Sequence, residues 1–201
     1  MNKRLMLALL SSVVAVQLLA PASVGAGMQK NNASAPQIQK SSSRPNSDQV
    51  KARIAEQVRH ELALLPWYGV FDWIEGQVTS DGAVTLRGMV TRPTTMSDAE
   101  FRVKRLESVS KVVNRIEVLP LSSSDNAIRV ATYRAIFNYN GPLYRYALGS
   151  RPSLHIIVKN GRITLKGVVS NSMDKQLAYT AARQVPGAFE VTDELRVEGR
   201  G

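Results

Sequence analysis

The sequence is short of the residues from which catalytic and metal sites are built. It has no cysteine among 201 residues, so it can form no disulfide, no thiolate nucleophile and no Cys-based zinc site. Its two histidines, His60 and His155, stand in no HxxxH or HExxH spacing. The phosphate-loop patterns GxxxxGK(S/T) and GxGxxG are also missing. We therefore expect no enzyme, no metal site, no cofactor and no small-molecule substrate.

Long hydrophobic runs are scarce as well, and the one that exists lies at the N-terminus. A positive MNKR stretch precedes the apolar run Leu5–Ala20, and small residues follow at Val24–Ala26. This order is typical of a secretory signal peptide over residues 1–26, cleaved after Ala26 rather than after Ala22. An uncleaved anchor is the weaker interpretation, because a span needs about 20 apolar residues. No cysteine follows the run, so a lipoprotein is excluded. We expect a periplasmic or otherwise exported protein.

The sequence is strongly basic. The formal net charge is +10 and the pI is about 10.1, which favours an anionic partner such as nucleic acid, a lipid surface or an acidic protein. Export separates the chain from nucleic acid. We therefore expect a phospholipid membrane surface, with envelope proteins as the second class of partner. Residues 27–47 are polar and small, without apolar periodicity, and we expect them to be a disordered leader.

An internal repeat organises the rest of the chain. The phrase DGAVTLRGMV begins at Asp81, and NGRITLKGVV begins at Asn160. In this register Val118 falls on Val197 without a gap, and one extra residue upstream lets Val78 match Val158. Self-similarity of this length indicates two copies of one structural unit.

The glycines of the repeat have a structural interpretation. Gly82 and Gly161 stand in the turn of a predicted hairpin, where a positive φ is required. Gly88 and Gly167 lie in the middle of the following strand, where glycine allows a bulge or the close approach of another element. We expect all four to serve backbone geometry and none to hold a phosphate.

Each copy predicts the same order of elements, α-β-β-α-β, within residues 48–120 and 121–201. Asp48 and Asp125 stand where a helix N-cap is expected, and SDAE at Ser97–Glu100 has the pattern of a capping box. A strand–helix–strand crossover joins parallel strands. Each unit is then a three-stranded mixed sheet with two helices on one face, which is an α+β fold. Such small units are expected to pack together.

The repeated phrases, with VSKVVNRIEVLP and VPGAFEVTDELRV after them, resemble the pattern of the bacterial osmotic-shock and nodulation (BON) domain. The resemblance covers Asp48–Val197 as two domains in tandem, residues 48–120 and 121–201, as in osmotically inducible periplasmic proteins. Ser108 departs from the family, which prefers the glycine found at Gly187. The resemblance implies an exported, non-enzymatic protein. Family members are associated with phospholipid binding, envelope integrity, osmotic stress tolerance or the assembly of envelope proteins.

The second copy carries most of the positive charge. It has 11 basic and 6 acidic residues, against 10 and 9 in residues 50–120 of the first copy, and no acid occurs between Asn126 and Met173. Arginine attracts lipid phosphate and tyrosine lies at headgroup depth, so this stretch favours a lipid interface. A solvated basic face with tyrosines in the core is the alternative. The candidate lipid- or partner-binding residues are Arg129, Arg134, Tyr144, Arg145, Tyr146 and Arg151.

The first copy instead concentrates aromatic residues in PWYGVFDWIE, Pro66–Glu75. The segment predicts a membrane wedge or a protein-binding edge, and Trp67, Tyr68 and Phe71 are the candidates for a protein contact. An aromatic plug between the two units is the favoured alternative, because the acidic residues of this segment would be repelled by anionic lipid.

Three hypotheses of function follow. The leading one is an exported protein that binds anionic phospholipid and supports envelope integrity or osmotic stress tolerance. The second is a periplasmic protein-interaction or chaperone-like module that uses the aromatic segment. The third is a scaffold that self-assembles through exposed sheet edges.

Overall fold

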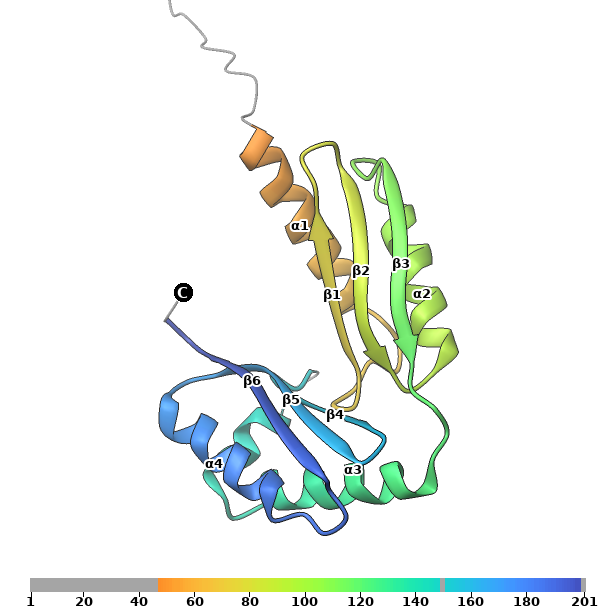
Figure 1. The fold of residues 1–201 in the computed structure, drawn as a ribbon. Coiled ribbons are helices and arrows are strands. Elements are labelled where there is room, and N and C mark those ends of the chain that lie inside the picture. The colour runs from red at the N-terminus through yellow and green to blue at the C-terminus, as the bar shows by residue number, and fades with distance from the viewer. Residues whose placement is uncertain (1–46, 149–150, 200–201) are drawn as a thin grey trace, which may run out of the picture. The chain divides into compact units, whose positions relative to one another are not determined.

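Two three-stranded mixed sheets, each with its own helices, make up the fold, as the sequence predicts (Figure 1). The computed structural model describes residues 47–148 and 151–199. The expected signal peptide, and the expected leader up to residue 46, lie outside the described residues. We refer to residues 47–120 as the first domain and to residues 121–199 as the second domain.

The first domain has the order α-β-β-α-β. Its elements are α1 (Ser47–Ala63), β1 (Trp73–Val78), β2 (Ala83–Val90), α2 (Pro93–Lys104) and β3 (Lys111–Val118). In the sheet order β1-β2-β3, β1 is antiparallel to β2, and β3 is parallel to β2. Both outer strands therefore keep one edge that pairs with no strand of this sheet.

The second domain repeats this order with one addition. Its elements are α3 (Ser123–Ile136), the 3₁₀ helix η1 (Pro142–Ala147), β4 (Leu154–Lys159), β5 (Arg162–Val169), α4 (Ser172–Arg183) and β6 (Glu190–Val197). The sheet order β4-β5-β6 has the same antiparallel and parallel pairs. The addition, η1, lies in the long connection between α3 and β4.

Each domain has its own hydrophobic core between helices and sheet. In the first domain, Ile54, Val58 and Leu62 recur at helical spacing along α1 and pack with Val84 and Leu86 of β2. Apolar side chains buried at this spacing stabilise a helix against a sheet by about 1.5–3 kcal/mol each. The core of the second domain is built in the same way from α3, α4 and the inner face of its sheet.

The mid-strand glycines allow a close approach between strands. Gly88 has a φ of +137° and Gly167 a φ of +118°. A Cβ at Gly88 would overlap the carbonyl oxygen of Trp73, and one at Gly167 would overlap that of Ser153. In the turns, Gly82 and Gly161 also have positive φ, +80° and +73°. A Cβ at Gly82, Gly88 or Gly167 would thus meet backbone atoms, and one at Gly161 would meet the Phe189 ring.

Helix α2 begins earlier than the capping-box pattern predicts. Its first residue is Pro93 and its N-cap is Arg92, which makes no side-chain cap. Proline suits the first helical position because its φ is already helical and its missing N–H would have no partner there. The Ser97 hydroxyl lies inside the helix and donates to the Pro93 carbonyl at 3.1 Å. The SDAE pattern is therefore not a helix start.

Helix α3 is capped by Ser122 and not by Asp125. The Ser122 Oγ accepts from the Asp125 N–H at 3.1 Å. The Asp125 carboxylate is buried, and it accepts the backbone N–H groups of Asn160 and Gly161 at 2.9 and 2.8 Å. Asp125 thus fixes the β4–β5 turn against α3, a tertiary contact that local sequence does not reveal.

The segment before β1 joins the two domains. The Val70 carbonyl accepts the Ile156 N–H at 2.8 Å along the outer edge of β4. Val70 and Phe71 also pack against the core of the second domain, where the Phe71 ring lies 6.2 Å from that of Tyr133. The first domain thus contributes backbone and side chains to the packing of the second.

Candidate functional site

Arg129, the first of the six residues predicted to bind lipid or a partner, lies inside the second domain. It is 6% exposed, and its Nη2 donates to the Val158 carbonyl at 2.8 Å. Burial lowers the pKa of its guanidinium, and the nearby Asp125 carboxylate opposes that shift. A guanidinium held in this way is not available to a lipid headgroup, which corrects the prediction for Arg129.

Tyr146 and Arg145 are tied to Asp174 of α4. The Tyr146 hydroxyl donates to Asp174 Oδ2 at 2.5 Å and accepts the Ser170 N–H at 2.8 Å. Arg145 pairs with the same carboxylate, and its hydrogen bond with Tyr146 is the main cause that raises its pKa. Tyr146 is buried and anchors η1 to α4, which corrects its predicted role as a surface contact. About half of the Arg145 side chain remains exposed.

Other side chains at the end of α3 and in η1 do reach solvent. Arg134 is exposed on the last turn of α3. Tyr139 is 78% exposed and its ring lies 5.1 Å from that of Tyr144, which is partly buried. Leu148, directly after η1, is 56% exposed. We call Arg134, Tyr139, Tyr144, Arg145 and Leu148 the basic–aromatic surface.

The aromatic segment of the first domain divides between interior and surface. Phe71 packs on the second domain, and the Tyr68 hydroxyl accepts the Ile74 N–H at 3.3 Å. Burial raises the pKa of Tyr68 to about 12. Only Trp67 of the three predicted contacts is largely exposed, at 74%, with the Arg92 guanidinium 5.2 Å from its ring centroid. Tyr68 and Phe71 thus fit the plug interpretation.

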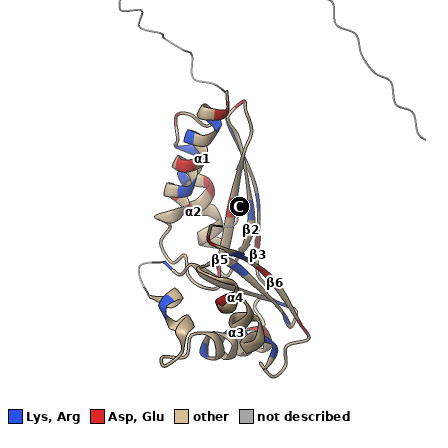
Figure 2. Ribbon diagram, turned by 90° about the vertical axis from the view of Figure 1, so that its left-hand side faces the viewer, with Lys and Arg blue, Asp and Glu red and all other residues tan. Residues whose placement is uncertain are grey.

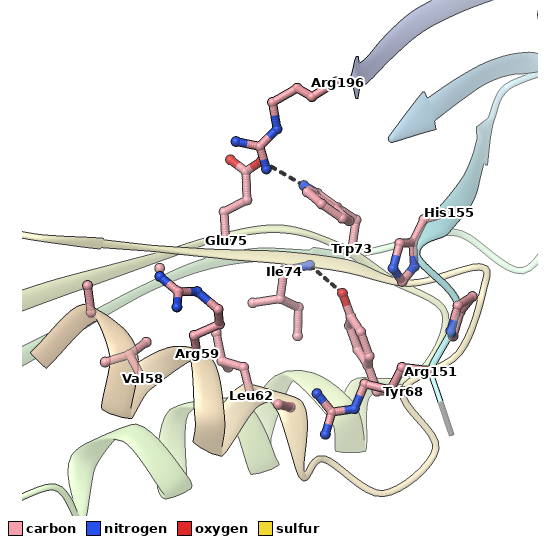
Figure 3. A pocket seen from close by; sticks show the side chains of 14 residues that line it. Val58, Arg59, Leu62, Tyr68, Trp73, Ile74, Glu75, Arg151, His155 and Arg196 are labelled. Carbon is pink, nitrogen blue, oxygen red and sulfur yellow. Dashed lines mark hydrogen bonds between the residues drawn. The ribbon is translucent and has the colours of Figure 1, made fainter. Parts of the chain in front are cut away.

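A hollow of about 550 Å³ lies beside the outer edge of β1 (Figure 3). Three guanidinium groups line it, those of Arg59 on α1, Arg151 before β4 and Arg196 on β6. Aromatic and aliphatic side chains form the remaining walls, among them Leu62, Tyr68, Trp73, Ile74 and Pro152. We call this hollow the arginine groove. It brings Arg151 together with Tyr68 and not with the basic–aromatic surface.

The charges of the arginine groove are only partly compensated. Arg59 pairs with Glu56 on α1. The one carboxylate lining the hollow, Glu75, accepts the Trp73 indole N–H at 2.9 Å. Among the described residues, neither Arg151 nor Arg196 has a carboxylate partner. The groove therefore presents net positive charge to whatever enters it.

His155 at the end of the groove is enclosed by the aromatic segment. Its ring lies 5.5 Å from that of Tyr68 and 5.0 Å from that of Trp73. Its Nδ1 lies 3.2 Å from the Gly69 carbonyl, an acceptor, so Nδ1 carries the proton and donates. Burial lowers the pKa of His155 below its ordinary value of 6.5. His155 is thus a packed side chain whose neutral form is favoured by burial.

The sequence pointed to some of these residues and not to others. Arg59 and Arg196 were missed, because they stand 137 positions apart and neither belongs to an acid-free stretch. Figure 2 shows both signs of charge along α1, so nothing in its local sequence sets Arg59 apart. In the part of the chain that the structure describes, no cluster of His, Asp and Glu could hold a metal ion.

A comparison with protein families shows to which family the repeated domains belong. The model of the BON domain matches residues 50–120 and 145–199, well over half of the chain. The chain belongs to the BON domain family. Members of the BON family are generally non-enzymatic and typically periplasmic or exported. The second BON match begins inside η1 and leaves α3 outside it, and the boundary at residue 121 stays a prediction.

No described helix of this BON protein combines the length and the apolar character needed to cross a membrane. Among solved structures, two from the type III secretion system of Chlamydia trachomatis are similar. The C-terminal domain of its structural protein CdsD is 12% identical, with 72% of this chain and 96% of that chain covered and a TM-score of 0.27. A second CdsD structure is 13% identical, with coverages of 71% and 91% and a TM-score of 0.28. No curated protein matches the chain.

Proposed function

We propose that this protein binds anionic phospholipid peripherally at the cell envelope, through the basic–aromatic surface of its second domain. The observation that carries the proposal is the exposure of Tyr139 and Leu148 beside arginine, in a stretch where no acid occurs from Asn126 to Met173. Exposed rings and aliphatic side chains enter the headgroup region, while guanidinium groups attract lipid phosphate. Supporting envelope integrity or osmotic stress tolerance is the role we propose for this binding.

The strength of such a contact follows from the small number of charges. Each arginine near an anionic surface contributes about 1 kcal/mol. Because Arg145 is already paired with Asp174, the charge comes mainly from Arg134. Together with two exposed apolar groups, Tyr139 and Leu148, it gives weak and reversible binding. Because surface charge effects fade over about 10 Å at 0.1 M salt, we expect this weak binding to be measurable only at low ionic strength.

Cosedimentation with vesicles tests the proposal. The purified protein should pellet with phosphatidylglycerol vesicles at low salt, and much less with phosphatidylcholine vesicles. Arg134→Gln should lower the partition coefficient about fivefold, the equivalent of about 1 kcal/mol. Tyr139→Ala, made in the native protein, should lower the partition coefficient by more than Arg134→Gln does. Arg115→Gln is the matched control, because Arg115 is an exposed arginine of β3 in the first domain. Equal pelleting with both lipids, or equal losses for Arg115→Gln and Arg134→Gln, would refute the proposal.

A protein contact through the aromatic segment is the second candidate function. The exposure of Trp67 is the observation that favours it. Such a contact would survive high salt and would be lost in Trp67→Ala, which separates it from lipid binding.

A further inference from the structure

The outer edge of β4 shows how this fold uses a free strand edge. The Ile156 N–H points away from β5 and donates to the Val70 carbonyl at 2.8 Å. Ile156 is fully buried as a result of this cover and of the core behind it. A short extended piece of chain therefore occupies the edge of the second sheet.

The equivalent edge of the first sheet has no such cover. Gly76 pairs with Leu86, and Ile156 pairs with Leu165 at the same place in the repeat. The Ile74 N–H reaches the Tyr68 hydroxyl and so points away from β2. Since N–H groups alternate in direction along a strand, those of Gly76 and Val78 point outward too. Gly76 is exposed, and the described residues offer its N–H no acceptor along this edge.

The arginine groove runs beside this uncovered edge. Glu75 and Gly76 of β1 line it together with Arg59, Arg151 and Arg196. Unpaired backbone groups can accept an added strand, and the flanking side chains select its sequence. Guanidinium groups form charge-assisted hydrogen bonds with carboxylates. The edge thus offers backbone pairing, and its surroundings offer sites for acidic side chains.

We propose that the outer edge of β1 at Gly76 and Val78 binds an extended acidic segment of a partner protein by strand addition. Charge complementarity selects this occupant. The leader of this chain, with Lys30, Lys40 and Arg44 and no acid between residues 27 and 47, has the wrong sign. The loop of a second copy that carries Val70 is already engaged on β4 of its own chain. The inference is independent of the lipid contact proposed for the second domain.

A synthetic peptide with blocked ends and alternating glutamate and valine is a suitable probe. Titrated into the ¹⁵N-labelled full-length protein, it should shift the amide signals of Gly76 and Val78 and slow their exchange with solvent. The same peptide with lysine in place of glutamate should bind at least tenfold more weakly. A peptide with N-methylated central residues, which cannot donate to the edge, should lose the shifts at β1.

Variants of the groove complete the test. Arg151→Gln and Arg196→Gln should each weaken peptide binding about threefold, the effect of one exposed ion pair. Arg53→Gln should not, since Arg53 is exposed on α1 but does not line the groove. The proposal is overturned if the Gly76 amide does not respond, or if concentration alone shifts it through self-association. It also fails if Arg196→Gln weakens vesicle binding while the peptide does not bind, because the groove would then be a lipid site.

Discussion

At the scale of single residues, the mid-strand glycines allow a specific prediction about the free energy of unfolding. Gly88→Ala places a methyl group on the Trp73 carbonyl at a φ of +137°, and relief requires movement of the β1 backbone. We expect a loss of about 3 kcal/mol in the free energy of unfolding, measured by urea denaturation. Gly199→Ala is the matched control, because Gly199 also has a positive φ but no atom within 4 Å of the added Cβ. It should cost only about 1 kcal/mol.

The two variants separate steric contact from backbone conformation. If Gly88→Ala costs no more than Gly199→Ala, the close approach of β1 and β2 at this position is not real.

His155 gives a pH dependence of stability whose sign can be worked out. Burial lowers its pKa in the folded protein below 6.5. As the pH falls through the ordinary value, the unfolded chain takes up a proton that the folded chain refuses, so stability is lost. The urea concentration at the midpoint of unfolding should therefore decrease as the pH is lowered from about 7.5 to about 5.5. His155→Gln should make this pH dependence weaker. An equal slope in both proteins would assign the loss to other groups.

At the scale of elements, Asp125 and Ser122 test what begins α3. If Asp125 were only an N-cap, Asp125→Ala would cost about 1 kcal/mol. In the structure its carboxylate serves two N–H groups of the β4–β5 turn, so we expect a loss of about 3 kcal/mol in the free energy of unfolding. Ser122→Ala removes the actual cap and should cost about 1 kcal/mol. The reverse order in thermal or urea unfolding would contradict this assignment.

The elements themselves were predictable because hydrophobic periodicity and the repeat act locally. Ile54, Val58 and Leu62 identify α1 by spacing alone. The helix starts were less predictable, since Pro93 at the first helical position outweighs the SDAE pattern four residues later. Two of the six predicted contacts, Arg129 and Tyr146, turned inward because distant partners, Val158 and Asp174, hold them. Contacts of this kind depend on the packing of the fold and leave no signal in the neighbouring sequence.

At the scale of the whole molecule, one repeated fold carries two different surfaces. The second domain has the basic–aromatic surface and an edge of β4 covered by Val70. The first domain has mixed charges and an uncovered edge of β1 beside the arginine groove. The Val70 segment accounts for much of the difference, because it covers one edge and draws the aromatic residues of the first domain toward the second. This asymmetry is why we propose different surfaces for the two contacts, the basic–aromatic surface for lipid and the edge of β1 with the arginine groove for protein.

The positions of the tryptophans allow the central claim to be tested directly. Both Trp67 and Trp73 lie in the first domain, and the second has none. Vesicles of brominated phosphatidylglycerol quench only a tryptophan that reaches the lipid. We expect the fluorescence of the native protein to be unchanged at saturating vesicle concentration, and Tyr139→Trp to add a signal that these vesicles quench. An added tryptophan that escapes quenching, or native tryptophans that are quenched as strongly, would contradict lipid binding through the basic–aromatic surface.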